Sequence, residues 1–175
     1  MTNYFNNEIL EQAKIQRKKT LTIYLLILVL YLALSTVVLV RYMQLPYASP
    51  KIGTIKTVEF VLTFIMLIFS FIYLGIKFKR VNKFYIMCRN MSTGLKEEYT
   101  ASFFEYDESL NTKDGVDVKA LIFLQWNKFK NEYFERKVWV FYEKPFPEFK
   151  ENDMVRFVTQ GNVLIKYEII NEEDE

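Results

Sequence analysis

Histidine is absent from this chain and cysteine nearly so: among 175 residues there is no histidine and one cysteine, Cys88. The commonest general base and the commonest metal ligand are therefore missing. One cysteine without histidine cannot assemble a Cys/His zinc site or an internal disulfide, and nothing in the cysteine usage indicates an oxidising compartment. The sequence predicts neither a bound metal nor a cofactor.

Glycine is scarce as well, with five residues in the whole chain, so there is little material for phosphate-cradling loops. The patterns G-x-x-x-x-G-K-[ST], G-x-S-x-G, H-E-x-x-H and C-x-x-C do not occur. Acidic residues cluster, as at Glu97-Glu98 and Asp107-Glu108, but no apolar run frames them in the way that raises a pKa for acid catalysis. We therefore expect that the chain is not an enzyme.

Charge is divided unevenly along the chain. Residues 1–89 contain 12 Lys/Arg and 3 Asp/Glu, a net charge of +9, whereas residues 90–175 contain 11 and 18, a net charge of −7. The two halves add to the total of +2. This asymmetry predicts a basic membrane half followed by an acidic soluble half.

Two long apolar runs stand out in the basic half. The first, "TLTIYLLILVLYLALSTVVLV", is free of charge, and the second covers residues 60–76. About 20 apolar residues cross a hydrocarbon core of about 30 Å. We predict spanning helices over residues 20–41 and 58–91, the second with a cytosolic extension, and an extracytoplasmic loop over 42–57. A buried soluble hairpin and a signal peptide are the competing interpretations.

Basic residues flank this predicted hairpin on the outside and predict its direction. Positive-inside bias places both termini in the cytosol of a multi-pass protein of the cell membrane. Each basic residue near anionic lipid contributes about 1 kcal/mol of attraction. The predicted membrane-surface residues are Lys14, Arg17, Lys18 and Lys19 before the first run, and Lys77, Lys79, Arg80 and Lys83 after the second.

Polar side chains inside the two runs are few, and no carboxylate or amine lies mid-span, which argues against a proton relay. Glu59 stands at the margin, where it either snorkels or faces a protein neighbour. Residues 1–19 are predicted to form a cytosolic amphipathic helix with an apolar stripe at Phe5, Ile9 and Ala13; a partly ordered tail is the alternative. Cys88, on the cytosolic extension, is either S-palmitoylated or a packed thiol.

From Leu95 onward the pattern becomes β. Residues 98–107, 116–126, 136–143, 154–159 and 163–169 are rich in β-branched and aromatic residues, and turn residues separate them. Five strands in residues 95–170 predict an all-β domain, a small barrel of OB or SH3-like type, followed by an acidic tail over 171–175. Because burial favours a single face for the apolar residues of the last hairpin, we predict a three-residue loop with Gly161 or Asn162 at positive φ.

One segment of this domain interleaves aromatic and basic residues in the manner of a nucleic-acid stacking groove. The net negative charge of the domain argues against nucleic acid, so strand ends at a hairpin tip, a partner surface or a lipid-docking patch remain as interpretations. The candidate ligand or partner surface consists of Trp126, Lys128, Phe129, Tyr133, Arg136 and Lys137.

These features lead to two functional hypotheses. The first is a non-enzymatic membrane protein whose hairpin anchors a β-barrel for binding another protein or further copies of itself, for example as an accessory subunit. The alternative is a ligand-gated membrane effector whose barrel binds a small molecule such as a nucleotide signal. The available bases for such a pocket are Lys128, Arg136, Lys137, Arg156 and Lys166.

Overall fold

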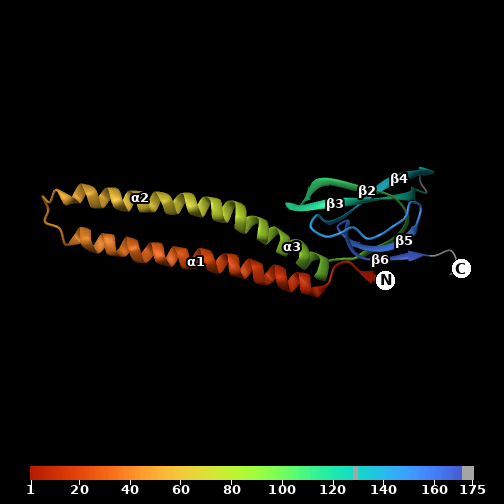
Figure 1. Cartoon of the computed structure of the whole chain (residues 1–175), viewed down its shortest axis with the longest axis horizontal. Coiled ribbons are helices and arrows are strands. Elements are labelled where there is room, and N and C mark those ends of the chain that lie inside the picture. Colours follow the sequence, from red (N-terminus) through yellow and green to blue (C-terminus); the bar gives the residue numbers. More distant parts are fainter. Residues whose placement is uncertain (128–129, 171–175) are drawn as a thin grey trace. The chain divides into compact units, whose positions relative to one another are not determined.

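The computed structural model describes residues 1–127 and 130–170 and divides the chain into two compact units. One unit is a helical hairpin, Ile15–Asn82, and the other combines residues 1–14 with the chain from Lys83 onward. The elements are β1 (Thr2–Asn3), α1 (Asn7–Met43), α2 (Lys51–Ile72), η1 (Tyr73–Phe78), α3 (Lys79–Thr93), β2 (Glu97–Lys113), β3 (Val116–Asn127), β4 (Glu132–Phe141), β5 (Met154–Gln160) and β6 (Val163–Ile170) (Figure 1). Two long apolar helices are thus followed by a closed five-stranded β-barrel, as predicted.

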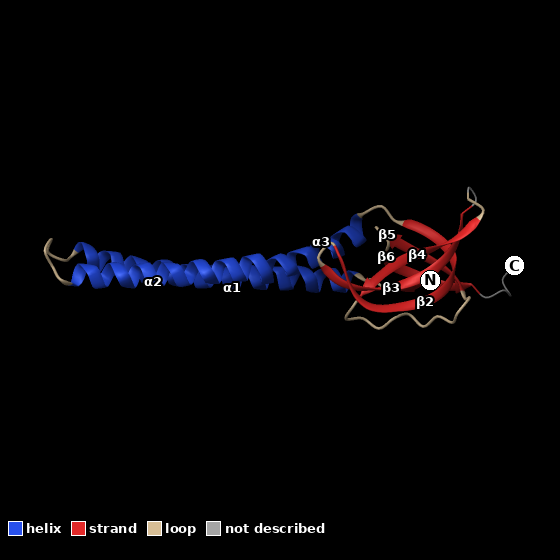
Figure 2. Ribbon diagram, turned by 90° about the horizontal axis from the view of Figure 1, so that it is seen from above, coloured by secondary structure: helices blue, strands red, loops and turns tan. Residues whose placement is uncertain are grey.

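The hairpin unit contains α1 from Ile15 onward, α2, η1 and the first residues of α3. Helices α1 and α2 run side by side in both views (Figures 1 and 2). Both the first helix and the continuous helix from Lys51 to Thr93 are long and apolar enough to cross a membrane. The connection between α1 and α2 is shorter than the predicted loop over 42–57, because α2 already begins at Lys51, directly after Pro50 with φ −63°. Proline favours a helix start, since its fixed φ suits the first turn and it has no amide hydrogen to leave unpaired.

The N-terminal residues depart from the helix predicted over 1–19. Helix α1 begins only at Asn7, and Thr2 and Asn3 instead form β1, which pairs antiparallel with β6. The Asn6 side chain accepts a hydrogen bond of 3.2 Å from the Ile9 backbone amide, and asparagine is a preferred residue for capping a helix in this way. This cap ends the extended segment and starts the helix.

The five-stranded barrel closes in the order β2-β3-β4-β6-β5, with β5 pairing back onto β2. All pairs are antiparallel except β4 with β6, which meet in parallel at the single pair Trp139 and Val163. Asp114 and Gly115, at φ 53° and 79°, form the two-residue turn between β2 and β3. The connection from β4 to β5 contains no helix in residues 142–153, where two prolines stand.

The β5–β6 hairpin corrects one prediction in an instructive way. Gln160 opposes Val163, so the loop has two residues rather than three. Gly161 and Asn162 both have positive φ, 56° and 64°, which is the backbone that a two-residue turn of type I′ requires. A bulge between Val158 and Thr159 then shifts the register by one residue. Beyond it Phe157 opposes Tyr167, so the apolar residues still share one face.

The barrel unit contains two apolar clusters, one inside the barrel and one against its outer wall. The inner cluster fills the barrel with side chains from all five strands and from the β4–β5 connection: Ala101, Phe103, Leu121, Phe123, Val138, Val140, Phe149, Val155, Phe157 and Leu164. The outer cluster joins the N-terminal segment and α3 to one wall of the barrel: Phe5, Ala13, Met87, Cys88, Met91, Val116, Val118, Phe141, Val163 and Ile165. The N-terminal residues are therefore part of the core of this unit.

Candidate functional site

The predicted candidate surface is only partly brought together. Trp126 of β3 and Tyr133 of β4 are direct cross-strand partners, and their rings meet edge to face with centroids 4.9 Å apart. Both rings are exposed, at 44% and 67%, so they offer an accessible aromatic pair at the end of this hairpin. Lys128 and Phe129 lie outside the described residues.

Arg136 is engaged within the barrel rather than presented to a ligand. Its guanidinium donates to the side chains of Gln125 at 3.1 Å and Asn162 at 2.9 Å. The guanidinium carbon Cζ lies 3.4 Å from the centroid of the Tyr99 ring. The guanidinium nitrogen Nη2 lies 4.0 Å from a carboxylate oxygen of Glu97. The planar, delocalised guanidinium suits this combination of forked hydrogen bonding and stacking. Arg136 therefore ties β3, β4, β2 and the last turn together.

Lys137 points to a different neighbour. Its Nζ lies 3.2 Å from an Asp107 carboxylate oxygen on β2. The Asp107 carboxylate also accepts from the hydroxyl and the backbone amide of Ser109, and these hydrogen bonds, with that from Lys137, lower the pKa of Asp107. Trp126 and Tyr133 are thus in contact, whereas Arg136 and Lys137 serve separate internal contacts.

The two helices of the hairpin are joined by a row of polar contacts. Two of these contacts join hydroxyl groups: the oxygens of Tyr24 and Ser70 are 3.2 Å apart, and those of Tyr31 and Thr63 are 3.1 Å apart. The Ser35 hydroxyl donates to the Glu59 carboxylate at 2.5 Å. The Tyr73 hydroxyl donates to the Thr20 backbone carbonyl at 3.0 Å. Steps of three, four and seven residues keep these positions on one face of each helix.

The outward faces of the same helices are apolar. Side chains that are more than half exposed include Leu26, Val29, Leu30, Phe60, Phe64, Ile65, Leu67 and Phe71. This arrangement is the reverse of a water-soluble hairpin, which buries apolar side chains and exposes polar ones. Most polar residues of the two apolar runs thus face each other across the hairpin, whereas the Thr36 hydroxyl bonds the Leu32 carbonyl of its own helix.

The predicted membrane-surface lysines and arginines have varied surroundings. Lys14 pairs with Glu11 at 3.4 Å, Lys77 lies 5.3 Å from the Tyr73 ring centroid, and Lys83 lies over the β2–β3 turn. The Lys83 side chain contacts Gly115. Glycine suits this position because its φ of 79° lies in the left-handed region, which residues with a Cβ rarely adopt. Lys18, Lys19 and Lys79 are exposed.

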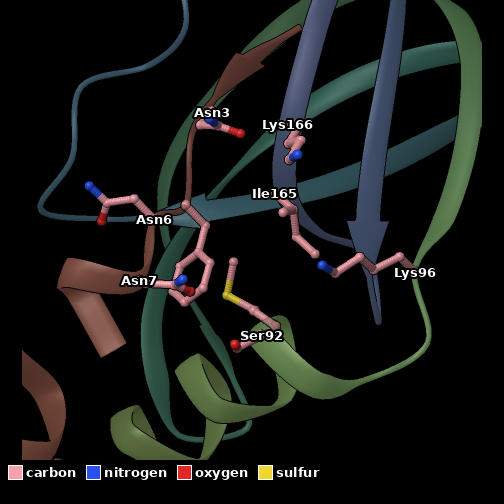
Figure 3. A pocket seen from close by; sticks show the side chains of 9 residues that line it. Asn3, Asn6, Asn7, Ser92, Lys96, Ile165 and Lys166 are labelled. Atoms are coloured by element: carbon pink, nitrogen blue, oxygen red, sulfur yellow. The ribbon is translucent and has the colours of Figure 1, made fainter. Parts of the chain in front are cut away.

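A concave pocket of about 340 Å³ opens on the barrel unit, where the N-terminal segment, α3 and β6 meet (Figure 3). Phe5, Met91 and Ile165 line it with apolar surface. Its polar lining consists of Asn3, Asn6, Asn7, Ser92, Lys96 and Lys166. Of these, sequence reasoning had named only Lys166 as an available base, since no local pattern links residues 3–7 to residues 92–96 and 165–166.

Close to this pocket, the N-terminal segment is held by a cluster around Tyr4. Lys144 donates to the Tyr4 carbonyl at 2.9 Å and lies 5.0 Å from its ring centroid. Burial raises the pKa of the Tyr4 phenol and lowers that of Lys144. Burial also raises the pKa of the Cys88 thiol to about 12, although the charge of Lys144 opposes that rise. Cys88 is fully buried. Of the two interpretations of this residue, the packed thiol therefore agrees with the structure.

Comparisons of the chain with protein-family models, with curated proteins and with solved structures found no match. The functional argument therefore rests on the geometry of the two units.

Proposed function

We propose that this chain is a non-enzymatic integral membrane protein whose helical hairpin anchors the barrel unit for binding another protein or further copies of the chain. The observation that carries this proposal is the inverted polarity of the hairpin. The hydroxyl pairs Tyr24–Ser70 and Tyr31–Thr63 and the contact of Ser35 with Glu59 lie between the helices, and the outer faces expose large apolar side chains. In water an apolar surface of this extent promotes association, whereas in lipid it is matched by the acyl chains.

The basic residues on both sides of the hairpin support a cytosolic location for both termini. Lys14, Lys18 and Lys19 precede the first span, and Lys77 and Lys79 follow the second. The bias of lysine and arginine toward the cytosolic flank then places residues 44–50 outside the cell membrane. The barrel unit lies in the reducing compartment under this orientation.

We assign the barrel to the OB type. Five strands, a meander of the first three and a parallel contact between the third and fifth give the strand order of a small Greek-key barrel, in which β4 and β6 complete the closure through one residue pair. The interior is filled by apolar side chains, which leaves its outer surface for recognition. The exposed pair Trp126 and Tyr133 supports a protein contact, because aromatic residues with a polar tip are enriched at interfaces.

The orientation is tested by labelling one introduced cysteine at a time in intact cells with a membrane-impermeant maleimide. Tyr47 and Leu95 are both exposed, at 101% and 92%, and the only native thiol, Cys88, is buried. We expect Tyr47→Cys to react in intact cells and Leu95→Cys to react only after lysis. Labelling of Leu95→Cys before lysis, or recovery of the protein in the soluble fraction without detergent, contradicts the proposal.

The interaction role is tested by native mass measurement of gently solubilised protein. We expect a defined oligomer or a stoichiometric complex. The double variant Trp126→Ala and Tyr133→Ala is expected to weaken this assembly. Lys150→Ala is the matched control, because Lys150 is exposed but belongs to a different segment. A lone monomer under all mild conditions contradicts this part of the proposal and leaves the membrane assignment intact.

A further inference from the structure

We infer that the pocket between the N-terminal segment, α3 and β6 binds the phosphate group of a small organic phosphate. This site is separate from the barrel interior and from the surface around Trp126. Its volume of about 340 Å³ lies at the lower end of the range of about 300–1,000 Å³ that is typical of ligand pockets.

The charge of the pocket lining carries this inference. Lys96 and Lys166 both line the pocket, and no acidic residue is among its lining residues. Neither lysine side chain forms an ion pair or hydrogen bond with any residue of the described part of the chain. The two ammonium groups thus border one concavity without an acidic partner among the described residues, although residues 90–175 carry a net charge of −7. Lysine is a common phosphate binder because it acts as a point charge.

The neutral groups of the pocket suit the same ligand class. Asn3 and Asn7 present side-chain amides whose polar atoms have no partner among the described residues, and Ser92 contributes a hydroxyl (Figure 3). Amide and hydroxyl donors add hydrogen bonds to phosphate oxygens. Phe5 and Ile165 supply apolar surface for the organic part of the ligand. The pocket therefore fits an anionic group attached to a small, partly apolar body.

Binding in this pocket has a structural consequence. Lys166 belongs to β6, Asn3 to β1, Lys96 to the segment between α3 and β2, and Asn7 to the start of α1. A ligand that contacts all four holds the N-terminal segment onto the barrel. The backbone amides of Tyr4 and Phe5, which donate to the Ile165 carbonyl at 2.9 Å and 3.0 Å, report this directly through their rate of hydrogen exchange.

The test uses the full chain in nanodiscs of phosphatidylcholine, with inorganic phosphate and adenosine 5′-monophosphate as soluble probes. Affinity is measured by calorimetry, and exchange is measured at Tyr4 and Phe5. A second set of nanodiscs contains phosphatidic acid and no soluble probe. Protection with a soluble probe identifies a free phosphate compound as the source of the group. Protection with phosphatidic acid alone identifies a lipid headgroup, and either result supports the site.

Three variants make the test specific. Lys96→Glu and Lys166→Glu are each expected to weaken binding roughly tenfold, and the double variant roughly a hundredfold. Lys150→Glu makes the same charge change elsewhere and should leave affinity unchanged. Both pocket lysines are exposed, and Lys96→Ala with Lys166→Ala serves as a milder pair if charge reversal disturbs folding. No protection with any probe, or equal protection in the double variant, overturns the inference without affecting the membrane assignment.

Discussion

Ser35 of α1 donates a hydrogen bond of 2.5 Å to Oε1 of Glu59 in α2, close to the end of the hairpin. The second carboxylate oxygen of Glu59 is buried without a partner among the described residues. This contact and the pairs Tyr24–Ser70 and Tyr31–Thr63 align the helices in one register. Polar contacts of this kind specify which helix faces meet, since packing between apolar helices in lipid is poorly selective.

The first prediction concerns the strength of this contact. In a double-mutant cycle with Ser35→Ala and Glu59→Met, which removes the donor and the acceptor in turn, we expect a coupling energy of about 0.6 kcal/mol, the average for side-chain hydrogen bonds between membrane helices. The measurement is the free energy of unfolding in mixed micelles. Thr36→Val is the control, because the Thr36 hydroxyl bonds the Leu32 carbonyl of its own helix. Equal coupling of Thr36 with Glu59 would contradict this register.

The second prediction concerns Arg136. Replacement by lysine removes the fork that reaches Gln125 and Asn162 and weakens the stacking on Tyr99. We expect a loss of about 1–3 kcal/mol in the free energy of unfolding. Both tryptophans of the chain lie in the barrel, so their fluorescence during urea unfolding of the full chain reports on this unit.

The matched control is the next residue along the strand. Lys137→Met removes an exposed ion pair with Asp107, and such pairs contribute about 0–1 kcal/mol. If Lys137→Met destabilises the barrel as much as Arg136→Lys, the structural role assigned to Arg136 is wrong.

The third prediction concerns acid stability. Hydrogen bonds from Ser109 and Lys137 hold the pKa of the Asp107 carboxyl group below its usual value. A carboxyl group whose pKa is lower in the folded state contributes stability above the unfolded pKa, and this contribution is lost as pH falls through the folded pKa. We expect Asp107→Asn to lose less stability than the parent chain between about pH 5 and pH 2. Parallel acid unfolding curves for the two proteins would refute the assignment.

The fourth prediction concerns Cys88. The thiolate is the reactive form of cysteine, and burial raises the pKa of this thiol to about 12. We expect Cys88 to remain unlabelled by iodoacetamide at neutral pH until the barrel unit unfolds. Leu95→Cys, at a position that is 92% exposed, provides a fast-reacting control in the same chain. Rapid labelling of native Cys88 would show that the outer cluster is open.

Much of the architecture was predictable because its signals are local. The charge-free run over 20–40, the alternation in 116–126 and the turn residues Asp114-Gly115 each act within a few neighbours. The β5–β6 hairpin shows the limit of such reasoning. The alternation of apolar and polar residues correctly predicted that the apolar residues of this hairpin share one face. A bulge between Val158 and Thr159, rather than a longer loop, gives the register in which they do so. Either solution satisfies the pattern of burial, so the sequence pattern alone did not choose between them.

The sequence by itself determined that there are two apolar helices and five strands, because residue periodicity and turn chemistry depend on neighbours in the chain. Only the tertiary structure decided that Thr2 and Asn3 pair with β6, that Arg136 bonds Asn162, and that Lys96 and Lys166 border one pocket. These contacts join residues far apart along the chain. Their formation depends on how the barrel closes and packs against the N-terminal segment, which no local pattern specifies.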